Sequence, residues 1–136
     1  MDRQNISSGT PWEAMAGYSR AVRIGDHVYV SGTTASDASG AVQSAGDVAG
    51  QTRYVLDKIA AALAQVGATL HDVVRTHVFV RNIDDWEAVA RVHGAVFETI
   101  RPANTLVRAE MIDPAMLVEI EAEAVVTRRQ DDKMTR

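Results

Sequence analysis

Apolar and polar residues alternate along residues 19–32, which read SRAVRIGDHVYVSG. A period of two residues is typical of a strand with one buried face, and Gly25-Asp26 interrupts the alternation as a tight turn would. The pattern therefore predicts a hairpin of two strands. Residues 33–46 are small, polar and glycine-containing, so we expect a flexible loop after the hairpin.

The spacing of apolar residues changes to a helical period over residues 47–66. Asp47 stands at the position of an N-cap, and Gly67 at that of a C-terminal cap. A second stretch of helical spacing, residues 84–100, opens on two aspartates and ends before Pro102. We therefore expect two amphipathic helices. Their apolar faces carry Val48, Val55, Ile59, Leu63 and Val66 in the first, and Trp86, Val89, Val92, Val96 and Phe97 in the second.

Residues 72–82, between the two predicted helices, return to a period of two residues. This alternation predicts a third strand. One face of it would carry Val74, Thr76, Val78 and Val80, and the other Arg75, His77, Phe79 and Arg81.

The last part of the chain, residues 101–126, contains two alternating runs joined by Asp113-Pro114, which predicts a second hairpin. We expect the apolar sides of both strands to face the helices, because a slip of one residue would turn every one of them outward. The other face would present charges that pair with neighbouring strands or are covered by a second subunit. The predicted buried set is Thr105, Val107, Ala109 and Met111 with Val118, Ile120, Ala122 and Ala124, and the opposite set is Asn104, Leu106, Arg108 and Glu110 with Glu119, Glu121 and Glu123.

The predicted order of elements is ββαβαββ. This order indicates a single α+β domain over residues 1–128, with the helices on one face of the sheet. Residues 129–136 contain Met134 as their one apolar residue, and we expect this charged tail to be disordered.

Composition narrows the class of protein. A chain of 136 residues with 46% hydrophobic and 24% charged residues fits one globular domain. It has no cysteine, which excludes disulfides, thiolate metal sites and a cysteine nucleophile, and fits a reducing compartment. No segment has the apolar core of a signal peptide or the ~20 apolar residues that span a bilayer. We therefore expect a soluble, cytoplasmic protein with no membrane partner.

Charge and histidine spacing exclude further classes. The formal net charge of −4 argues against nucleic acid as a partner, since nucleic-acid-binding domains present a basic face. The histidines show no spacing typical of metal ligands, so we expect no metal site and no cofactor. They are His27, His71, His77 and His93.

Several segments resemble motifs of the RidA family, also called the YjgF or L-PSP endoribonuclease-like family. In chain order these segments are GYSRAVRIGDHVYVSG, GAV, DVAGQTRYVLDKIAAALAQVGATLHDVVRTHVFV, RPAN and VEIEAEAVV, and together they cover residues 17–126. The resemblance implies a chorismate-mutase-like fold, assembled as a homotrimer with small-molecule sites in the clefts between subunits. It also implies hydrolytic deamination of reactive enamine and imine acids to 2-keto acids and ammonia.

The resemblance implies roles for individual residues. Tyr18 matches the family's site tyrosine, and Glu119 matches a glutamate expected to hold or activate water. Ser31 and Gly32 match a Ser-Gly pair whose backbone faces the ligand. Without the resemblance, a tyrosine at this place would be read as a buried or interface residue, and a strand glutamate as a paired surface carboxylate.

Two positions depart from the family pattern. Asn104 stands where the deaminase branch has an arginine that holds the substrate carboxylate through two hydrogen bonds, and neutral asparagine cannot reproduce that pair. Losing a charged partner weakens binding by about 10- to 100-fold unless another charge replaces it. Leu106 replaces a small residue or cysteine, and Arg101 and Arg20 are candidates for the replacement charge.

Two functions are compatible with these residues. The first is a RidA-like hydrolase of enamines or imines with altered substrate specificity. The second is a noncatalytic trimer that binds or senses a small metabolite in the same cleft. The candidate catalytic residues are Glu119 and Tyr18, and the candidate substrate-binding residues are Ser31, Gly32, Asn104, Leu106 and Arg101.

Overall fold

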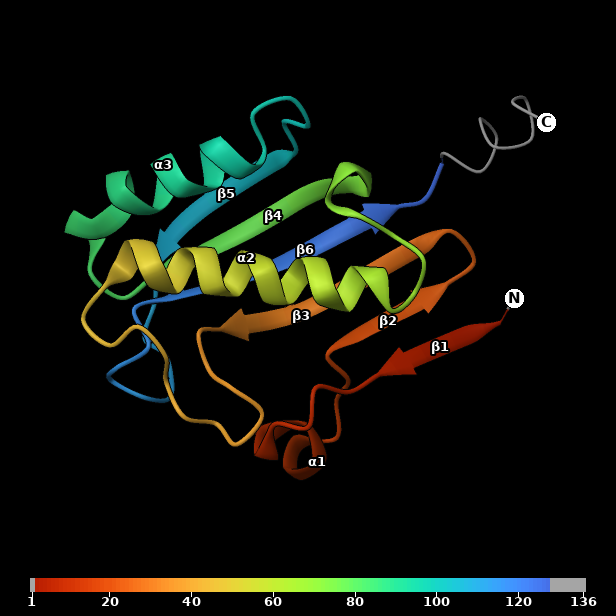
Figure 1. The fold of residues 1–136 in the computed structure, drawn as a ribbon, viewed down its shortest axis with the longest axis horizontal. Helices are drawn as coiled ribbons and strands as arrows, with labels where there is room; N and C mark the ends of the chain where they lie inside the picture. The colour runs from red at the N-terminus through yellow and green to blue at the C-terminus, as the bar shows by residue number, and fades with distance from the viewer. Residues whose placement is uncertain (1, 128–136) are drawn as a thin grey trace.

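Six strands form one mixed sheet, and two helices pack against one of its faces (Figure 1). This computed structural model describes residues 2–127. The helices on that face are α2 (Val48–Ala64) and α3 (Trp86–Val96). Across the sheet the strand order is β1-β2-β3-β6-β4-β5. The strands are β1 (Arg3–Ile6), β2 (Ala21–Ile24), β3 (His27–Thr34), β4 (Val73–Val80), β5 (Ala103–Arg108) and β6 (Val118–Val125).

The α+β class, with the helices on one face of the sheet, is confirmed. The structure adds an N-terminal strand, β1, and a short helix, α1 (Pro11–Ala16), neither of which was predicted from the sequence. It also contains two short 3-10 turns, Leu70–Asp72 and Ile83–Asp85. The expected disordered tail, residues 129–136, lies outside the described residues. No helix within residues 2–127 is long and apolar enough to cross a bilayer.

Helix α2 begins at its predicted N-cap and ends at Ala64, two residues before the predicted Val66. The side chain of Asp47 accepts a hydrogen bond from the backbone N–H of Gly50 at 2.9 Å, which makes it the N-cap. At the other end Gly67 has a φ of 77°. Its N–H donates to the carbonyl of Ala64, and the N–H of the next residue donates to that of Leu63. This closing turn satisfies carbonyls that the helix itself leaves free.

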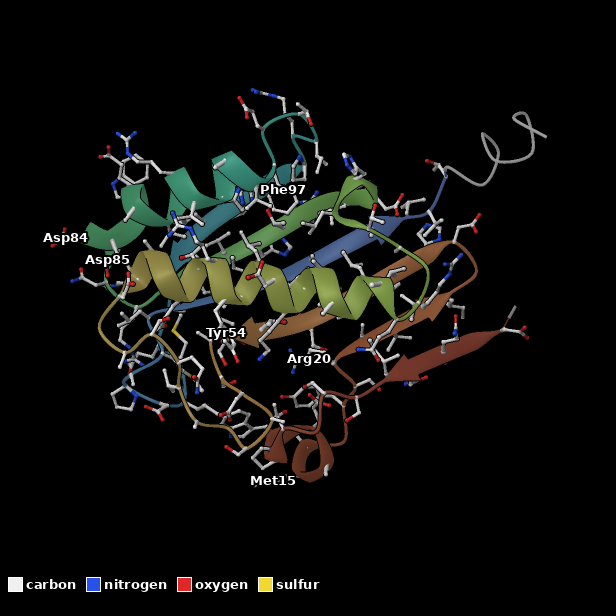
Figure 2. The ribbon with its side chains drawn as sticks, viewed as in Figure 1. Met15, Arg20, Tyr54, Asp84, Asp85 and Phe97 are labelled. Carbon is white, nitrogen blue, oxygen red and sulfur yellow. The ribbon has the colours of Figure 1, made fainter. Side chains whose placement is uncertain are left out.

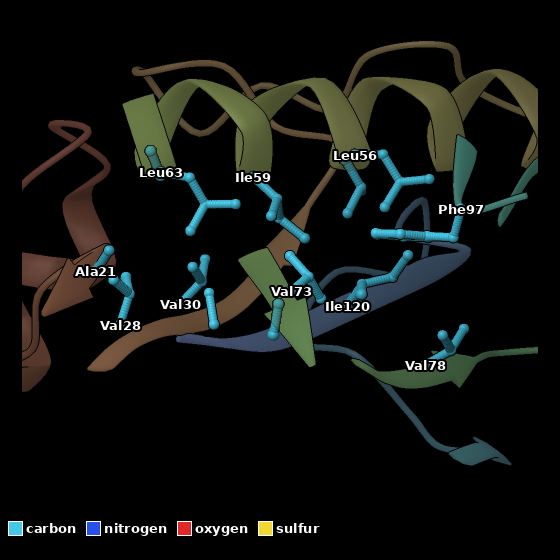
Figure 3. Packing of buried hydrophobic residues seen from close by; sticks show 14 of the residues in the cluster. Ala21, Val28, Val30, Leu56, Ile59, Leu63, Val73, Val78, Phe97 and Ile120 are labelled. Carbon is cyan, nitrogen blue, oxygen red and sulfur yellow. The ribbon is translucent and has the colours of Figure 1, made fainter. Parts of the chain in front are cut away.

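The hydrophobic core lies between α2 and the sheet. Figure 3 shows Leu56, Ile59 and Leu63 projecting from α2 toward the strands, with Phe97 entering from the end of α3. Full burial of one such large apolar side chain adds about 1.5–3 kcal/mol to the free energy of unfolding. The predicted buried face of β6 is confirmed, since Val118, Ile120, Ala122 and Ala124 are all buried.

The predicted C-terminal hairpin is wrong. β5 pairs in parallel with β4, whereas β6 lies between β3 and β4 and runs antiparallel to both. The reason is the connection through α3, which returns the chain to the sheet in the direction of β4. The segment after β5 then carries the chain back to the central position of β6.

The predicted faces of β5 are therefore reversed. Leu106 is paired in register with Val78 and packs against the core on the helix side, because parallel pairing aligns the pleats of the two strands. Val107, expected to be buried, is 44% exposed. On β4 a register shift between Val73 and Arg75 moves Val74 out of the buried face, and Val73 takes its place in the core.

The face opposite the helices carries the predicted ladder of charges on β6 and β4. Arg75 lies opposite Glu123 in the register, and His77 lies opposite Glu121. The Nδ1 atom of His77 is 2.8 Å from a carboxylate oxygen of Glu121. The strands thus place basic side chains opposite acidic ones across the sheet, as the sequence indicated.

Candidate functional site

A cavity of about 320 Å³ opens beside the ends of β3 and β6. Its wall is built by α1, α2, the C-terminal half of β3 and the segment that leads into β6. Ionisable side chains in the wall are those of Tyr18, Arg20, Lys58, Glu110 and Glu119. The remaining lining is partly apolar and includes Trp12, Met111 and Met116.

Glu119 reaches the cavity by lying over Gly32. A Cβ atom added at Gly32 would stand 2.2 Å from Oε2 of Glu119, so only glycine leaves room for the carboxylate here. Burial raises the pKa of Glu119, the charge of Arg20 opposes the shift, and that of Glu121 adds to it. The carboxylate has no hydrogen-bond or ion-pair partner within residues 2–127, so it is available to a ligand or to water.

Arg20 is 5% exposed and lies between α1 and α2 in the view of Figure 2. Its Nη1 donates to the carbonyl of Gly32 at 2.6 Å and to Oγ1 of Thr33 at 2.9 Å. Its Nε donates to a carboxylate oxygen of Glu13 at 3.3 Å. The guanidinium also lies 5.7 Å from the ring centre of Tyr18. These contacts hold the guanidinium group of Arg20 and the ring of Tyr18 in place at the cavity wall.

Glu13 holds Arg20 from the other side. Its carboxylate accepts hydrogen bonds from the hydroxyl of Ser7 at 2.8 Å, from Oγ1 of Thr10 at 2.9 Å, and from both the hydroxyl and the N–H of Ser8. Burial by itself would raise the pKa of Glu13, but the hydrogen bonds from Ser8, Ser7 and Thr10 outweigh it and lower the pKa to about 2. The group stays ionised and balances the buried guanidinium.

Lys58 projects from α2 toward the end of β3. Its Nζ donates to the carbonyl of Thr34 at 2.9 Å and to that of Ser36 at 2.8 Å. Burial, followed by the charge of Arg20, lowers the pKa of Lys58 to about 8, while Glu13 and Asp37 act in the opposite direction. Lys58 is therefore mostly protonated at neutral pH, as a half-buried cation at the cavity.

The structure brings together three of the residues that the sequence singled out, Tyr18, Gly32 and Glu119. Ser31 is their neighbour, but its hydroxyl donates to the carbonyl of Ser19 at 2.7 Å rather than lining the cavity. Arg20, named as a candidate charge, does line it.

Three candidate residues lie elsewhere in the chain. Asn104 and Leu106 belong to β5, which two strands separate from β3, and Arg101 precedes that strand with a φ of 54°. The side-chain amide of Asn104 donates to Oγ1 of Thr76 at 2.9 Å, and Thr76 contacts Nε2 of His93 at 2.9 Å. Within a single chain these residues do not reach the cavity, and their part in a cleft between subunits stays a prediction.

Sequence reasoning missed Glu13 and Lys58. A signal for α1 was present, because Thr10 followed three residues later by Glu13, with Pro11 between them, fits the start of a helix. Lys58 stands next to the apolar stripe of α2, where a lysine reads as an ordinary surface residue.

Comparison with known proteins decides the family. The family model described as Endoribonuclease L-PSP matches residues 9–126. This chain belongs to the RidA (YjgF, L-PSP) family. Among RidA-family relatives, 3-aminoacrylate deaminase RutC of Acinetobacter baylyi is 36% identical over 121 residues, which cover 89% of this chain and 95% of RutC. Protein SCO2049 of Streptomyces coelicolor is 37% identical over 122 residues, covering 89% and 90% of the two chains.

Solved structures of RidA-family proteins share the fold. Rv2704 from Mycobacterium tuberculosis is 48% identical and superimposes with a TM-score of 0.83 over 92% of this chain and 100% of that one. The YjgF gene product of E. coli is 29% identical, with a TM-score of 0.78 over 91% and 99%. Within residues 2–127 no cluster of three or more histidine, aspartate or glutamate side chains could hold a metal ion.

Proposed function

We propose that this RidA-family protein hydrolyses small reactive enamine or imine acids, releasing ammonia. The observation that carries the proposal is the carboxylate of Glu119, which is partly buried in the cavity without a partner among the described residues. Because burial raises its pKa, it can both accept and return a proton closer to neutral pH than an exposed glutamate. Family membership and the similarity to RutC, a 3-aminoacrylate deaminase, support this reaction class.

The proposed reaction needs one water molecule and no oxidant or reductant. Protonated Glu119 gives its proton to the carbon of an enamine, which becomes an iminium ion. The carboxylate then takes a proton from water as the water oxygen bonds to the C=N carbon. The resulting carbinolamine receives that proton on nitrogen and expels ammonia. Its hydroxyl proton passes to the Glu119 carboxylate, which leaves a carbonyl product and restores protonated Glu119. Tyr18, at the same cavity wall, orients the substrate in this scheme.

The same proposal includes assembly as a homotrimer. The sheet face opposite the helices has no cover within the described chain and exposes apolar residues, with Tyr29 47% exposed and Val107 44% exposed. An uncovered face of this kind is typical of an interface between subunits. Light scattering should give a mass about three times 14.7 kDa, and a mass of one chain at micromolar concentration would remove the proposed intersubunit cleft.

A noncatalytic role in metabolite binding is the second candidate, and Asn104 favours it. The position matching the family's substrate-binding arginine holds a neutral amide, which is already bonded to Thr76. A protein of this kind would bind the carbonyl product or the imine without accelerating hydrolysis.

The two candidates are separated by an activity assay. An amino acid oxidase generates the imine from alanine or leucine in solution, and the rate of imine disappearance is measured with each protein. Glu119→Gln should lower the rate by about 100-fold or more, since general acid–base catalysis contributes 10²- to 10⁴-fold, and Tyr18→Phe should lower it less. The melting temperatures should stay close to that of the wild type. Glu87→Gln, at an exposed position of α3 outside both the cavity and the proposed subunit interface, should keep full activity. A wild type without activity would favour the binding role.

A further inference from the structure

We propose that Arg20 and Lys58 form a carboxylate-binding subsite in the cavity that Glu119 lines. The ligand of this site is then a small carboxylic acid with its C=N or C=O carbon next to the carboxylate, as in a 2-imino or 2-oxo acid. This inference rests on the proposed function, because it names the substrate class of the same cavity.

The two cations are anchored on β3 at points whose spacing suits a bridging carboxylate. Arg20 bonds to the carbonyl of Gly32, and Lys58 bonds to the carbonyl of Thr34, two residues further along β3. Carbonyls two residues apart on a strand are separated by roughly 7 Å. A carboxylate that accepts one hydrogen bond of about 2.8 Å at each oxygen joins cations at about this distance. Both side chains line the cavity.

Both cations retain donors for a ligand. The hydrogen bonds of Arg20 are made by Nε and Nη1, and its Nη2 has no hydrogen-bond partner within residues 2–127. The ammonium group of Lys58 has three N–H donors, and its two short bonds go to backbone carbonyls. Its third contact, with Oγ of Ser36, is long at 3.5 Å. An anion entering the cavity therefore finds N–H groups that are not yet used.

The cavity lining carries two cations, Arg20 and Lys58, and two carboxylates, Glu110 and Glu119. Glu13 balances Arg20 in an ion pair. Lys58 forms no ion pair with a described carboxylate, and Asp37 bonds instead to Ser39, Gln43 and the N–H of Ala41. Glu119 lines the cavity as well, where burial disfavours its charged form. Lys58 is thus a cation at the cavity without an ion-pair partner among the described residues, and a ligand carboxylate would provide one.

This subsite would replace the charge that position 104 lacks. Asn104 donates its amide to Thr76, so it offers a ligand neither a charge nor a free fork of donors. Arg20 and Lys58 are held in place by β3 backbone carbonyls, and Glu119 lies over the same strand at Gly32. The carboxylate and the reacting carbon of one small ligand would thus be held along a single strand.

Binding of pyruvate and of its neutral analogue pyruvamide tests the subsite by calorimetric titration. The wild type should bind pyruvate about 10-fold or more tightly than pyruvamide, as a charged hydrogen-bond partner predicts. Lys58→Met should weaken pyruvate binding by about 10- to 100-fold and leave pyruvamide binding unchanged. Lys58→Arg should restore most of the preference. Arg53→Met removes a cation from an exposed position of the same helix and should change neither affinity.

Several results would overturn the subsite. They are equal affinity of the wild type for the two compounds, no pyruvate binding, or unchanged pyruvate affinity in Lys58→Met. Lys58→Gln gives the same test if the methionine variant does not fold. Because binding is measured without turnover, the two proposals fail separately. Absence of imine hydrolysis in the wild type refutes the deaminase alone, whereas an unaffected Lys58→Met refutes the subsite alone.

Discussion

Substitution of Gly32 by alanine should inactivate the site without unfolding the protein. The new methyl group would lie 2.2 Å from Oε2 and 3.1 Å from Cδ of Glu119. The carboxylate must therefore move by about 1.2 Å to reach an ordinary contact distance of 3.4 Å. A reacting group misplaced by ~1 Å loses about 100-fold in rate, which corresponds to ~2.7 kcal/mol of transition-state stabilisation.

The free energy of unfolding should change little in Gly32→Ala. Replacing glycine where alanine fits the backbone stabilises a protein by about 0.4–1 kcal/mol, because the unfolded chain loses freedom. Turning the Glu119 side chain away from a preferred rotamer costs about 0.5–1.5 kcal/mol, which offsets that gain. A suitable control is Gly94→Ala in α3, where an added Cβ meets nothing within 4 Å. It should stabilise the helix by about 0.5–1 kcal/mol and leave the rate unchanged.

The imine-disappearance assay and thermal melts measure both effects. The sharpest comparison places Gly32→Ala in a Glu119→Ala background, where no carboxylate remains to be displaced. There the second substitution should lower the rate no further, because the two changes act on one interaction. Full activity of Gly32→Ala, or an additive loss in the double variant, would show that the position of Glu119 over Gly32 is not what the reaction requires.

Two further predictions concern buried charges and pH. Glu13→Gln should lower the free energy of unfolding by about 3–5 kcal/mol, because it leaves the guanidinium of Arg20 buried without its counter-charge, and a urea titration measures the loss. Burial lowers the pKa of His93 below its usual value of 6.5 in the folded protein. As the pH falls, His93 therefore becomes protonated in the unfolded chain at a higher pH than in the folded protein. The wild type should therefore be destabilised as pH falls below 6.5, and His93→Gln should lose that part of the pH dependence, as urea titrations at a series of pH values would show.

Elements with one buried face were predictable from the sequence. In α2 and β6 only one side contacts the core. Apolar residues therefore recur in the sequence every 3.6 residues in the helix and every 2 residues in the strand. β5 was not predictable in this way. Its alternation was recognised, but a pattern within a strand does not say which strand lies beside it, and the Asp113-Pro114 turn suggested the wrong neighbour. The connection through α3 decides the pairing, and that is a property of the tertiary structure.

The site was predictable only in part, for a related reason. Tyr18, Gly32 and Glu119 were found by their place in family motifs. The ion pair of Glu13 and Arg20 forms because α1 folds back against the start of β2. The segment around α1 has no periodic pattern of apolar residues from which this contact could be predicted. Lys58 meets β3 through the packing of α2 on the sheet. Contacts of this kind, between segments far apart in the sequence, cannot be predicted from the spacing of apolar and polar residues.

The central place of β6 has a consequence for the order in which the chain folds. β6 is synthesised after the other five strands of the sheet, yet it joins β3 on one side and β4 on the other. Until residues 118–125 are available, the β1-β2-β3 and β4-β5 segments have no hydrogen-bonded connection to each other. Such long-range pairing makes folding slow. Hydrogen-exchange protection of β3, β4 and β6 should therefore arise in one late step, and a chain ending before Val118 should lack the sheet as a whole.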